Sequence, residues 1–539
     1  MKPAEPAAEP ALTPADESEA VGGAEDLSGR DRIAWNVLTS WGGYLVEVVT
    51  GFVLPRLIDR QIGQAALGIW DFSWSCVAYF RLAQIGVANA TSRYLARYRA
   101  MQDDEGLRMV ASSTLGVSTG VALVVLLLTA LVTWAVPLFF GSRVGDQAVA
   151  AQWVVALLGA GLAFNYQCEV FSGVLTGSHR WDLHNALTAG SQLCIAAAMI
   201  AALYLGGGLF GIALAHTGGV VLVELVRMPV AYRVCPQLKL RPSYFSRAQA
   251  RRMLGFGAKS SVAAVARLLL TQANQIIVAS HLGPAALALY ARPNALLRVS
   301  ENLVGKLAFV LGPTASSLQG TGRQGEIREL VFKGTRAATA LVVPMTLGLV
   351  ILGGPLLRVW MGPRYDQGLI LAILALAFAP SLAQRPAMSI MTGLNLHGYI
   401  AFASLAAAIV GVALSIVNVT VLGLGLVGAA LAVAIPTLVM TGLVIPVYVC
   451  RRLQIPIRDF VREGYARPVV CGIPFALVLL ASRIGFADRP VLALLVGSLL
   501  GVLVLAPLYW KFVLPYQVRR MVLSAAPPAV LGRLGLARP

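Results

Sequence analysis

Charged residues are scarce in this chain of 539 residues. Asp, Glu, Lys and Arg make up 13% of it, and 57% is hydrophobic. Soluble globular proteins carry about 25% charged residues. Because so few charges cannot cover a water-facing surface of this size, the composition excludes a soluble protein. Repeated apolar runs of roughly 20 residues predict helices that cross a membrane. Stretches such as Val121–Val132 and Val491–Pro507 lack the alternating polarity of membrane-barrel strands.

Motifs for metal binding, disulfides and nucleotide chemistry are also missing. The six cysteines include no CxxC pair and form no cluster with the five histidines, so neither a metal site nor a disulfide framework is expected. There is no Walker motif, nucleotide-binding glycine loop, DxD or HExxH. We therefore expect no cofactor, and an enzyme is disfavoured. A net charge of +18 suggests a nucleic-acid partner. Basic residues that set membrane topology explain it better, so membrane lipids rather than nucleic acid are the expected partners.

The apolar runs predict an all-α integral membrane protein with about fourteen transmembrane helices. The first six are predicted near residues 33–55, 66–90, 109–136, 148–175, 184–205 and 207–232. The others are predicted near 255–280, 285–312, 332–354, 367–392, 397–420, 423–449, 467–485 and 489–513. Lys and Arg concentrate in the connections after the second, sixth, eighth and twelfth spans. The positive-inside bias makes that side cytoplasmic and places both termini in the cytoplasm.

The chain divides into six predicted segments. They are a disordered cytoplasmic tail (1–28), an N-lobe (29–232), a cytoplasmic linker (233–254), a C-lobe (255–449), two trailing helices (450–515) and a basic cytoplasmic tail (516–539). Ala, Pro, Glu and Asp dominate the first tail, a composition that cannot bury a core.

A short repeat relates the two lobes. Ile62-Gly-Gln-Ala-Ala-Leu-Gly-Ile-Trp70 reappears 220 residues later as Leu282-Gly-Pro-Ala-Ala-Leu-Ala-Leu-Tyr290. Each copy follows the first span of its lobe. Six spans, an even number, separate the copies, so the lobes have the same orientation. This pattern predicts two six-helix lobes related by a pseudo-twofold axis along the membrane normal.

The landmarks around the repeat carry a family resemblance. They are the Gly-x-x-x-Leu-Gly/Ala-x-Trp/Tyr turn of each lobe, Gly86–Arg97, Pro313–Ser317 and Leu357–Tyr365. Together they resemble the polysaccharide and oligosaccharide flippases of the multidrug/oligosaccharidyl-lipid/polysaccharide exporter superfamily, over roughly residues 30–515. The resemblance implies lobes around a central cavity, alternating access and a bacterial inner-membrane location. It also implies undecaprenyl-pyrophosphate-linked glycan as cargo, and it leaves polysaccharide polymerase or assembly proteins open as partners.

Polar residues recur along one face of several predicted spans. In the first, seventh and eighth spans we predict a polar cavity lining of Asn36, Ser40, Thr50, Ser260, Thr271, Asn274 and Asn294. Small and polar residues that join helices would give the same pattern. Ionisable residues within spans are costly in lipid and usually face a cavity or a partner.

The repeat offset pairs charges of opposite sign. Glu47 corresponds to Arg267, and Arg81 to Glu301. Residues related by such an axis face each other when they line a central cleft, so we predict that each pair closes a gate in one conformational state. The alternative is that Arg298 and Glu301 form a local i,i+3 pair and that Arg81 only extends its charged end toward the membrane surface.

Cations dominate the second lobe and suggest an anionic cargo. The predicted substrate-binding residues are Arg267, Arg298, Arg385, Lys259, Lys306 and Arg292. Guanidinium groups bind phosphate oxygens bidentately, which suits a pyrophosphate. Pro386, beside Arg385, also removes a backbone donor within a span.

Three other functions stay open at this stage. A cation-coupled multidrug exporter of the same architecture would favour an acidic, aromatic cavity. A peptidoglycan-precursor flippase is a close variant, and a scaffold without transport is disfavoured by the charged stripes. The sequence does not identify the glycan or the energy source.

Overall fold

The structure, a computed structural model, describes residues 30–84, 87–140, 147–308, 311–515 and 519. Helices dominate these residues, which contain no strand, and this confirms the predicted all-α class. The predicted tail 1–28 lies outside the described residues, as does the tail 516–539 apart from Arg519.

Eleven helices among the described residues are long and apolar enough to cross a membrane. Each falls on a predicted span. The other three predicted spans, near 66–90, 255–280 and 285–312, hold many of the polar and charged residues discussed above. The protein is therefore a multi-pass membrane protein. Its three most polar predicted spans are not among the described helices that are long and apolar enough to cross a membrane.

By their internal contacts, the residues form two compact units. Unit 1 comprises Met1–Leu57, Phe80–Val136 and Val149–Ser261, and unit 2 comprises Ile58–Tyr79, Pro137–Ala148 and Val262–Pro539. The predicted lobe boundaries remain predictions.

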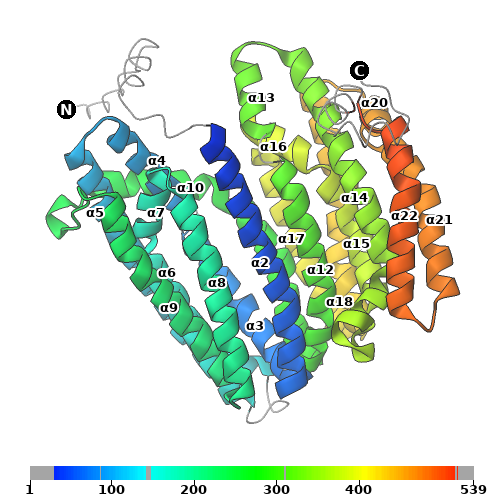
Figure 1. Ribbon diagram of the computed structural model, residues 1–539, viewed down its shortest axis with the longest axis horizontal. Coiled ribbons are helices and arrows are strands. Elements are labelled where there is room, and N and C mark those ends of the chain that lie inside the picture. Colours follow the sequence, from blue (N-terminus) through cyan, green and yellow to red (C-terminus); the bar gives the residue numbers. More distant parts are fainter. Residues whose placement is uncertain (1–29, 85–86, 141–146, 309–310, 516–518, 520–539) are drawn as a thin grey trace. The chain divides into compact units, whose positions relative to one another are not determined.

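Unit 1 is built mainly from the helices before residue 262. They are α2 (Arg30–Ile62, up to Leu57), η1 (Arg81–Gln84), α4 (Val87–Ala100), α5 (Asp104–Phe140, up to Val136), α6 (Gln147–Gln167, from Val149), α7 (Glu169–Gly177), α8 (Trp181–Tyr204), α9 (Gly208–Val234), η3 (Pro242–Tyr244) and α10 (Arg247–Leu268, up to Ser261). Helices α8 and α9 form a hairpin of two adjacent long helices (Figure 1). One apolar core joins α4, α5, α7 and α9 through Leu95, Val110, Phe171 and Ala231.

Unit 2 holds the later helices and one early helix, α3. Its elements are α3 (Gln64–Phe80), η4 (Leu269–Ala273), α11 (Asn274–Leu282), α12 (Pro284–Ala308), α13 (Leu311–Gly320), α14 (Gln324–Met361), η5 (Pro363–Tyr365), α15 (Gly368–Ala383), α16 (Arg385–Gly393), α17 (Gly398–Ile416), η6 (Val417–Val421), α18 (Gly425–Val439), η7 (Met440–Val444), α19 (Ile445–Leu453), α20 (Ile457–Val461), η8 (Arg462–Ala466), α21 (Arg467–Gly485) and α22 (Pro490–Phe512). In Figure 1, α14, α15, α21 and α22 lie side by side.

The same turn joins the helices of both repeat copies. Gly63 separates α2 from α3, Gly283 separates α11 from α12, and both glycines have a φ of 91°. Because a side chain is strained at such positive φ, glycine is the residue that fits both turns.

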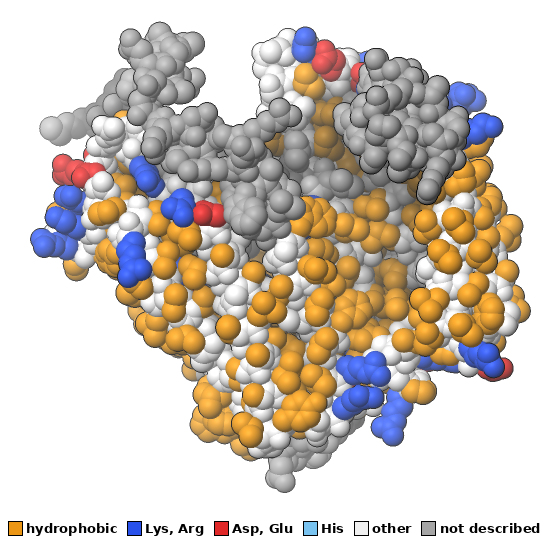
Figure 2. Space-filling model, viewed as in Figure 1, with side chains coloured by type: hydrophobic (Ala, Val, Ile, Leu, Met, Phe, Trp, Pro, Cys, Tyr) orange, Lys and Arg blue, Asp and Glu red, His pale blue; other side chains and the backbone are white. Residues whose placement is uncertain are grey.

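The outer surface of α21 and α22 matches a lipid environment. Leu495, Leu499 and Leu503 are each more than 60% exposed in the isolated chain. In Figure 2, hydrophobic side chains cover this region and charged side chains appear near its two ends. Between the two helices, Gly501 admits the Phe475 ring, because a Cβ there would lie 2.6 Å from it.

Candidate functional site

Helix α3 lies against α11 and α12, so the two repeat copies touch each other within unit 2. The Gln64 side-chain amide donates a hydrogen bond of 2.9 Å to the Ala285 carbonyl. At Gly68 the backbones approach so closely that a Cβ would lie 1.7 Å from the Pro284 carbonyl oxygen. Further along α3, the Ser75 hydroxyl donates to Gln275 Oε1 at 2.9 Å. These contacts make α3 part of the site.

A buried ion pair crosses this contact. Arg292 Nη2 donates to both carboxylate oxygens of Asp71, at 2.6 and 2.5 Å. The Arg292 side chain is 3% exposed and that of Asp71 is 15% exposed. Arg292, a predicted phosphate ligand, is therefore neutralised by a carboxylate that the sequence analysis did not select.

Two further arginines lie near acidic groups in unit 2. Arg385 Nη2 is 3.9 Å from Glu301 Oε1, with about a third of the Arg385 side chain exposed. Arg298 is exposed to solvent. It interacts electrostatically with Arg292, Asp71 and Glu301. Three guanidinium groups therefore share two carboxylates, which leaves this group of α12, α3 and α16 side chains with an excess positive charge.

The helix that carries Arg385 is interrupted. Helix α15 ends at Ala383 and α16 begins at Arg385, with Pro386 in its first turn. Between them, the Gln384 side-chain amide donates a hydrogen bond of 2.5 Å to the Thr441 carbonyl. Because proline cannot donate a backbone hydrogen bond, the break places Arg385 at the start of a new helix.

The predicted polar lining residues divide into two groups. Asn274 is buried, donates to the Tyr290 hydroxyl at 2.7 Å and accepts from the Ser415 hydroxyl at 2.5 Å. Asn294 donates to the Tyr290 carbonyl at 2.9 Å. Asn274 thus joins α11 to α12 and α17, whereas the Asn294 bond stays within α12. The hydroxyls of Thr50 and Thr271 likewise bond to backbone carbonyls one helical turn earlier in the chain.

The remaining predicted residues lie apart or outside the described side chains. The side chains of Asn36, Ser40, Lys259 and Ser260 are outside the described part of the chain. Lys306 is half-buried on α12, and Arg267 is exposed at the end of α10. Glu47 and Arg81 belong to unit 1, whereas Arg267 and Glu301 belong to unit 2, so the proposed gate pairs stay predictions.

Unit 1 contains a charged cluster that the sequence analysis missed. The Glu224 carboxylate pairs with Arg227, and both side chains are buried on α9. The Asn165 amide also donates to Glu224 Oε1, at 2.9 Å. Glu169 of α7 lies near both charges. The signal was present in the sequence, because Glu224 and Arg227 interrupt a predicted span at helical spacing.

A hydrogen bond joins the last turn of α2 to η5, the short helix that follows α14. The Tyr365 hydroxyl donates to Asp59 Oδ1 at 2.6 Å. Burial raises the pKa of Tyr365, and the bond to Asp59 raises it further, so the phenol remains a donor.

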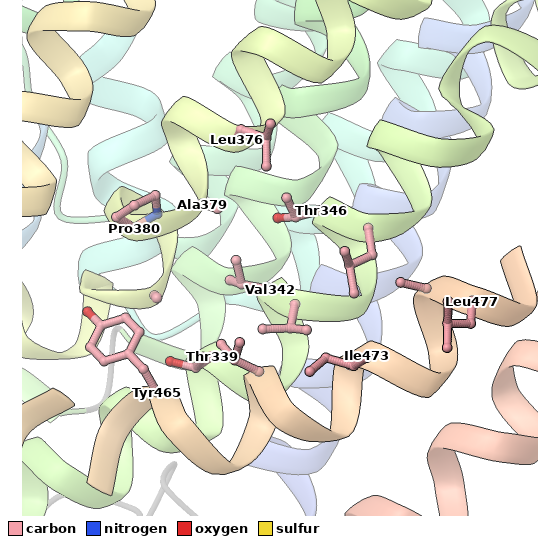
Figure 3. Close-up of a pocket in the computed structure, with 15 residues that line it drawn as sticks. Thr339, Val342, Thr346, Leu376, Ala379, Pro380, Tyr465, Ile473 and Leu477 are labelled. Atoms are coloured by element: carbon pink, nitrogen blue, oxygen red, sulfur yellow. The ribbon is translucent and has the colours of Figure 1, made fainter. Parts of the chain in front are cut away.

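An apolar pocket of about 440 Å³ lies between α14, α15 and α21. Figure 3 shows Val342 and Thr346 of α14 between Leu376 of α15 and Ile473 of α21. Leu376 and Ile473 are also exposed on the lipid-facing surface. No group of three metal-ligating side chains occurs among the residues that the structure describes.

Sequence comparison then decides the family. The sequence model of a family described as "Polysaccharide biosynthesis protein" matches residues 99–370, about half of the chain. The chain belongs to this polysaccharide biosynthesis family. It is also similar to "Uncharacterized membrane protein EpsK" of Bacillus subtilis (strain 168), with 23% identity over 414 residues that cover 76% of this chain and 81% of that protein.

Solved structures show that this member of the polysaccharide biosynthesis family has a known transporter fold. "Lipid II flippase MurJ, inward closed conformation" matches with a TM-score of 0.68 and 14% identity, covering 88% of this chain and 98% of MurJ. An inward-facing multidrug resistance MATE family transporter of the MOP superfamily matches with a TM-score of 0.64 and 15% identity, covering 77% of this chain and 96% of the transporter. Proteins with this fold include flippases and transporters, and at such low identity the likeness shows the fold alone.

Proposed function

We propose that this protein flips a lipid-linked oligosaccharide, an undecaprenyl-pyrophosphate-linked glycan, outward across the bacterial inner membrane by alternating access. Membership of the polysaccharide biosynthesis family supports a role in glycan assembly. The fold shared with a flippase and with multidrug transporters supports movement of a cargo rather than its chemical conversion. Polysaccharide polymerase or assembly proteins are the proposed partners, and both termini are proposed to be cytoplasmic.

The observation that carries the proposal is the excess positive charge of Arg292, Arg298 and Arg385 over Asp71 and Glu301. A pyrophosphate bears two or more negative charges, and arginine binds phosphate oxygens with a planar pair of donors. We assign the headgroup to Arg298 and Arg385, because Arg292 already holds Asp71. The apolar pocket of unit 2 offers space for part of a hydrocarbon chain.

Two related cargoes compete with this proposal. A multidrug exporter binds organic cations, for which a site with excess positive charge is unfavourable. A peptidoglycan-precursor flippase would move a lipid pyrophosphate with the same headgroup chemistry. The family match favours polysaccharide assembly over both.

The test is complementation of a strain that lacks its lipid-linked oligosaccharide flippase. We expect the chain to lower the amount of lipid-linked intermediate on the cytoplasmic face, while export of cationic dyes stays at background. Arg298→Gln and Arg385→Gln should each reduce flipping about tenfold or more, because a charge-assisted hydrogen bond is worth about 1.5–3 kcal/mol.

Arg323→Gln is the matched control. Arg323 lies in the same unit, but its side chain is 60% exposed and pairs with Glu326 at the surface, so this variant should flip normally. Export of cationic dyes without glycan flipping would contradict the proposal. So would equal rates of flipping by Arg298→Gln, Arg385→Gln and Arg323→Gln.

A further inference from the structure

A second pocket, of about 760 Å³, lies between α14, the start of α21 and the end of α22. Four basic side chains line it, those of Arg336, Arg467, Lys511 and Arg519. Among the described residues that line it, none is acidic. In Figure 1 this is the end of unit 2 at which α22 (red) finishes. The pocket therefore combines a high density of positive charge with the end of a membrane-spanning helix pair.

Only one of these four cations is neutralised by a carboxylate within the described part of the chain. Arg336 pairs with Glu463 and also donates a 2.8 Å hydrogen bond to the Glu463 carbonyl. Arg519 donates to the carbonyls of Leu514 and Lys511, both at 2.9 Å, so it caps α22 and keeps its full charge. Lys511 lies 5.4 Å from the centre of the Phe512 ring. About three positive charges are left for a ligand.

Apolar side chains make up another part of the lining. They include Val470 and Pro474 of α21 and Leu508 and Phe512 of α22. Val470 and Phe512 are also exposed on the surface that would contact lipid. A ligand here would place an anionic group among the cations and hydrocarbon along the wall. Free inorganic phosphate would contact the cations of such a site but not its apolar part.

The position of Arg467 argues for an amphiphilic ligand. Arg467 is the first residue of α21, at the edge of the predicted span 467–485, and apolar residues such as Val470 and Leu508 line the pocket beside it. An unpaired cation near hydrocarbon is costly. A phosphate at the membrane surface would remove that cost, and the positive-inside bias predicts that this surface is cytoplasmic.

We propose that the pocket binds the phosphate group of an anionic lipid from that leaflet, held by Arg467, Lys511 and Arg519. Basic pockets between transmembrane helices commonly bind such headgroups. The lipid phosphate can come from two sources. One is an anionic phospholipid of the bilayer, and the other is the polyprenyl diphosphate of the cargo before entry. The second source rests on the proposed function, whereas the first does not.

The test measures lipid binding by the purified full-length protein. It is placed in neutral phosphatidylcholine nanodiscs, and phosphatidylglycerol, cardiolipin or polyprenyl diphosphate is then added. Bound lipid is counted by native mass spectrometry, and the thermal unfolding midpoint is recorded. We expect an anionic lipid to raise the midpoint, because a ligand that binds only the folded state stabilises it.

The double variant Arg467→Gln/Lys511→Gln should bind the lipid about tenfold or more weakly, because it loses two charge-assisted contacts. The double variant Arg483→Gln/Arg489→Gln is the control, since it removes the same charge from the opposite ends of α21 and α22. It should behave as the wild type. The unfolding midpoint of each variant in neutral lipid shows whether it is folded.

The outcomes separate the two sources. Phospholipid binding that is lost only in the Arg467→Gln/Lys511→Gln variant supports a bilayer lipid, and it does so even if flipping is never observed. Loss confined to polyprenyl diphosphate supports the cargo. Equal binding by both double variants, or no preference for anionic over neutral lipid, overturns the proposal.

Discussion

Arg292 of α12 holds the carboxylate of Asp71 of α3 through one terminal nitrogen, although 221 residues separate the two. Asp71→Asn would leave a buried guanidinium without a counter-charge. Breaking a buried ion pair costs about 3–5 kcal/mol. We therefore expect a clear fall in the thermal unfolding midpoint in detergent, and a similar fall for Arg292→Gln.

The exchange Asp71→Arg/Arg292→Asp should recover part of that loss, because it restores the pair with reversed polarity. A surface pair in the same unit, Arg323 with Glu326, gives the reference, since exposed pairs contribute about 0–1 kcal/mol. If Asp71→Asn unfolds at the wild-type temperature, the pair does not stabilise the contact of α3 with α12.

Gly68 is the point of closest approach between the two repeat copies. A methyl group there would meet the Pro284 carbonyl oxygen at 1.7 Å, so Gly68→Ala must push α3 away from α12. We expect this variant to lose stability and transport. Gly348→Ala is the control, because nothing lies within 4 Å of its Cβ, and alanine there should stabilise α14 by about 1 kcal/mol. We therefore expect the thermal unfolding midpoint to fall in Gly68→Ala and to rise in Gly348→Ala.

The buried pair of unit 1 gives a third prediction. Glu224→Gln keeps the shape of the side chain and removes the charge that faces Arg227. Glu169 remains near Arg227, so we expect a moderate loss of about 1–3 kcal/mol. Removing both carboxylates in Glu169→Gln/Glu224→Gln should cost more than the sum of the single changes. Additive losses would show that Glu169 does not replace Glu224.

The predicted gate pairs can be tested by charge reversal. Glu47→Arg and Arg267→Glu should each reduce flipping in the complementation assay, and the double variant should restore it if the two residues pair during transport. The same holds for Arg81 and Glu301, although Glu301 also lies near Arg385 and its reversal should be more harmful. Failure of both double variants would leave the gate without support.

The sequence predicted the apolar helices well, because long hydrophobic runs have few alternatives to crossing a membrane. It also located the repeat, whose glycines Gly63 and Gly283 have the same φ of 91°. The length and the neighbours of the polar helices were harder to predict. Helix α3 has only 17 residues, and it belongs by its contacts to the later helices rather than to its neighbours in sequence.

Partners of buried charges were the least predictable feature. The 220-residue offset pairs equivalent positions, but Asp71 corresponds to Ala291 and not to Arg292. The residue that a buried charge contacts depends on the rotation of its helix as well as on its position along the helix. The pair Glu224–Arg227 needed no tertiary information, because an i,i+3 spacing already places the two side chains on one helix face.

The place of α3 among later helices also bears on how the protein is made. At about 5–20 residues per second, a ribosome needs roughly 10–40 seconds to proceed from Asp71 to Arg292. During that interval the newly inserted segment carries an acidic group without its natural counter-ion. The insertion machinery or lipid headgroups must interact with the Asp71 carboxylate until Arg292 is synthesised. If the chain were divided at residues 233–254, the first fragment would lack Arg292 permanently.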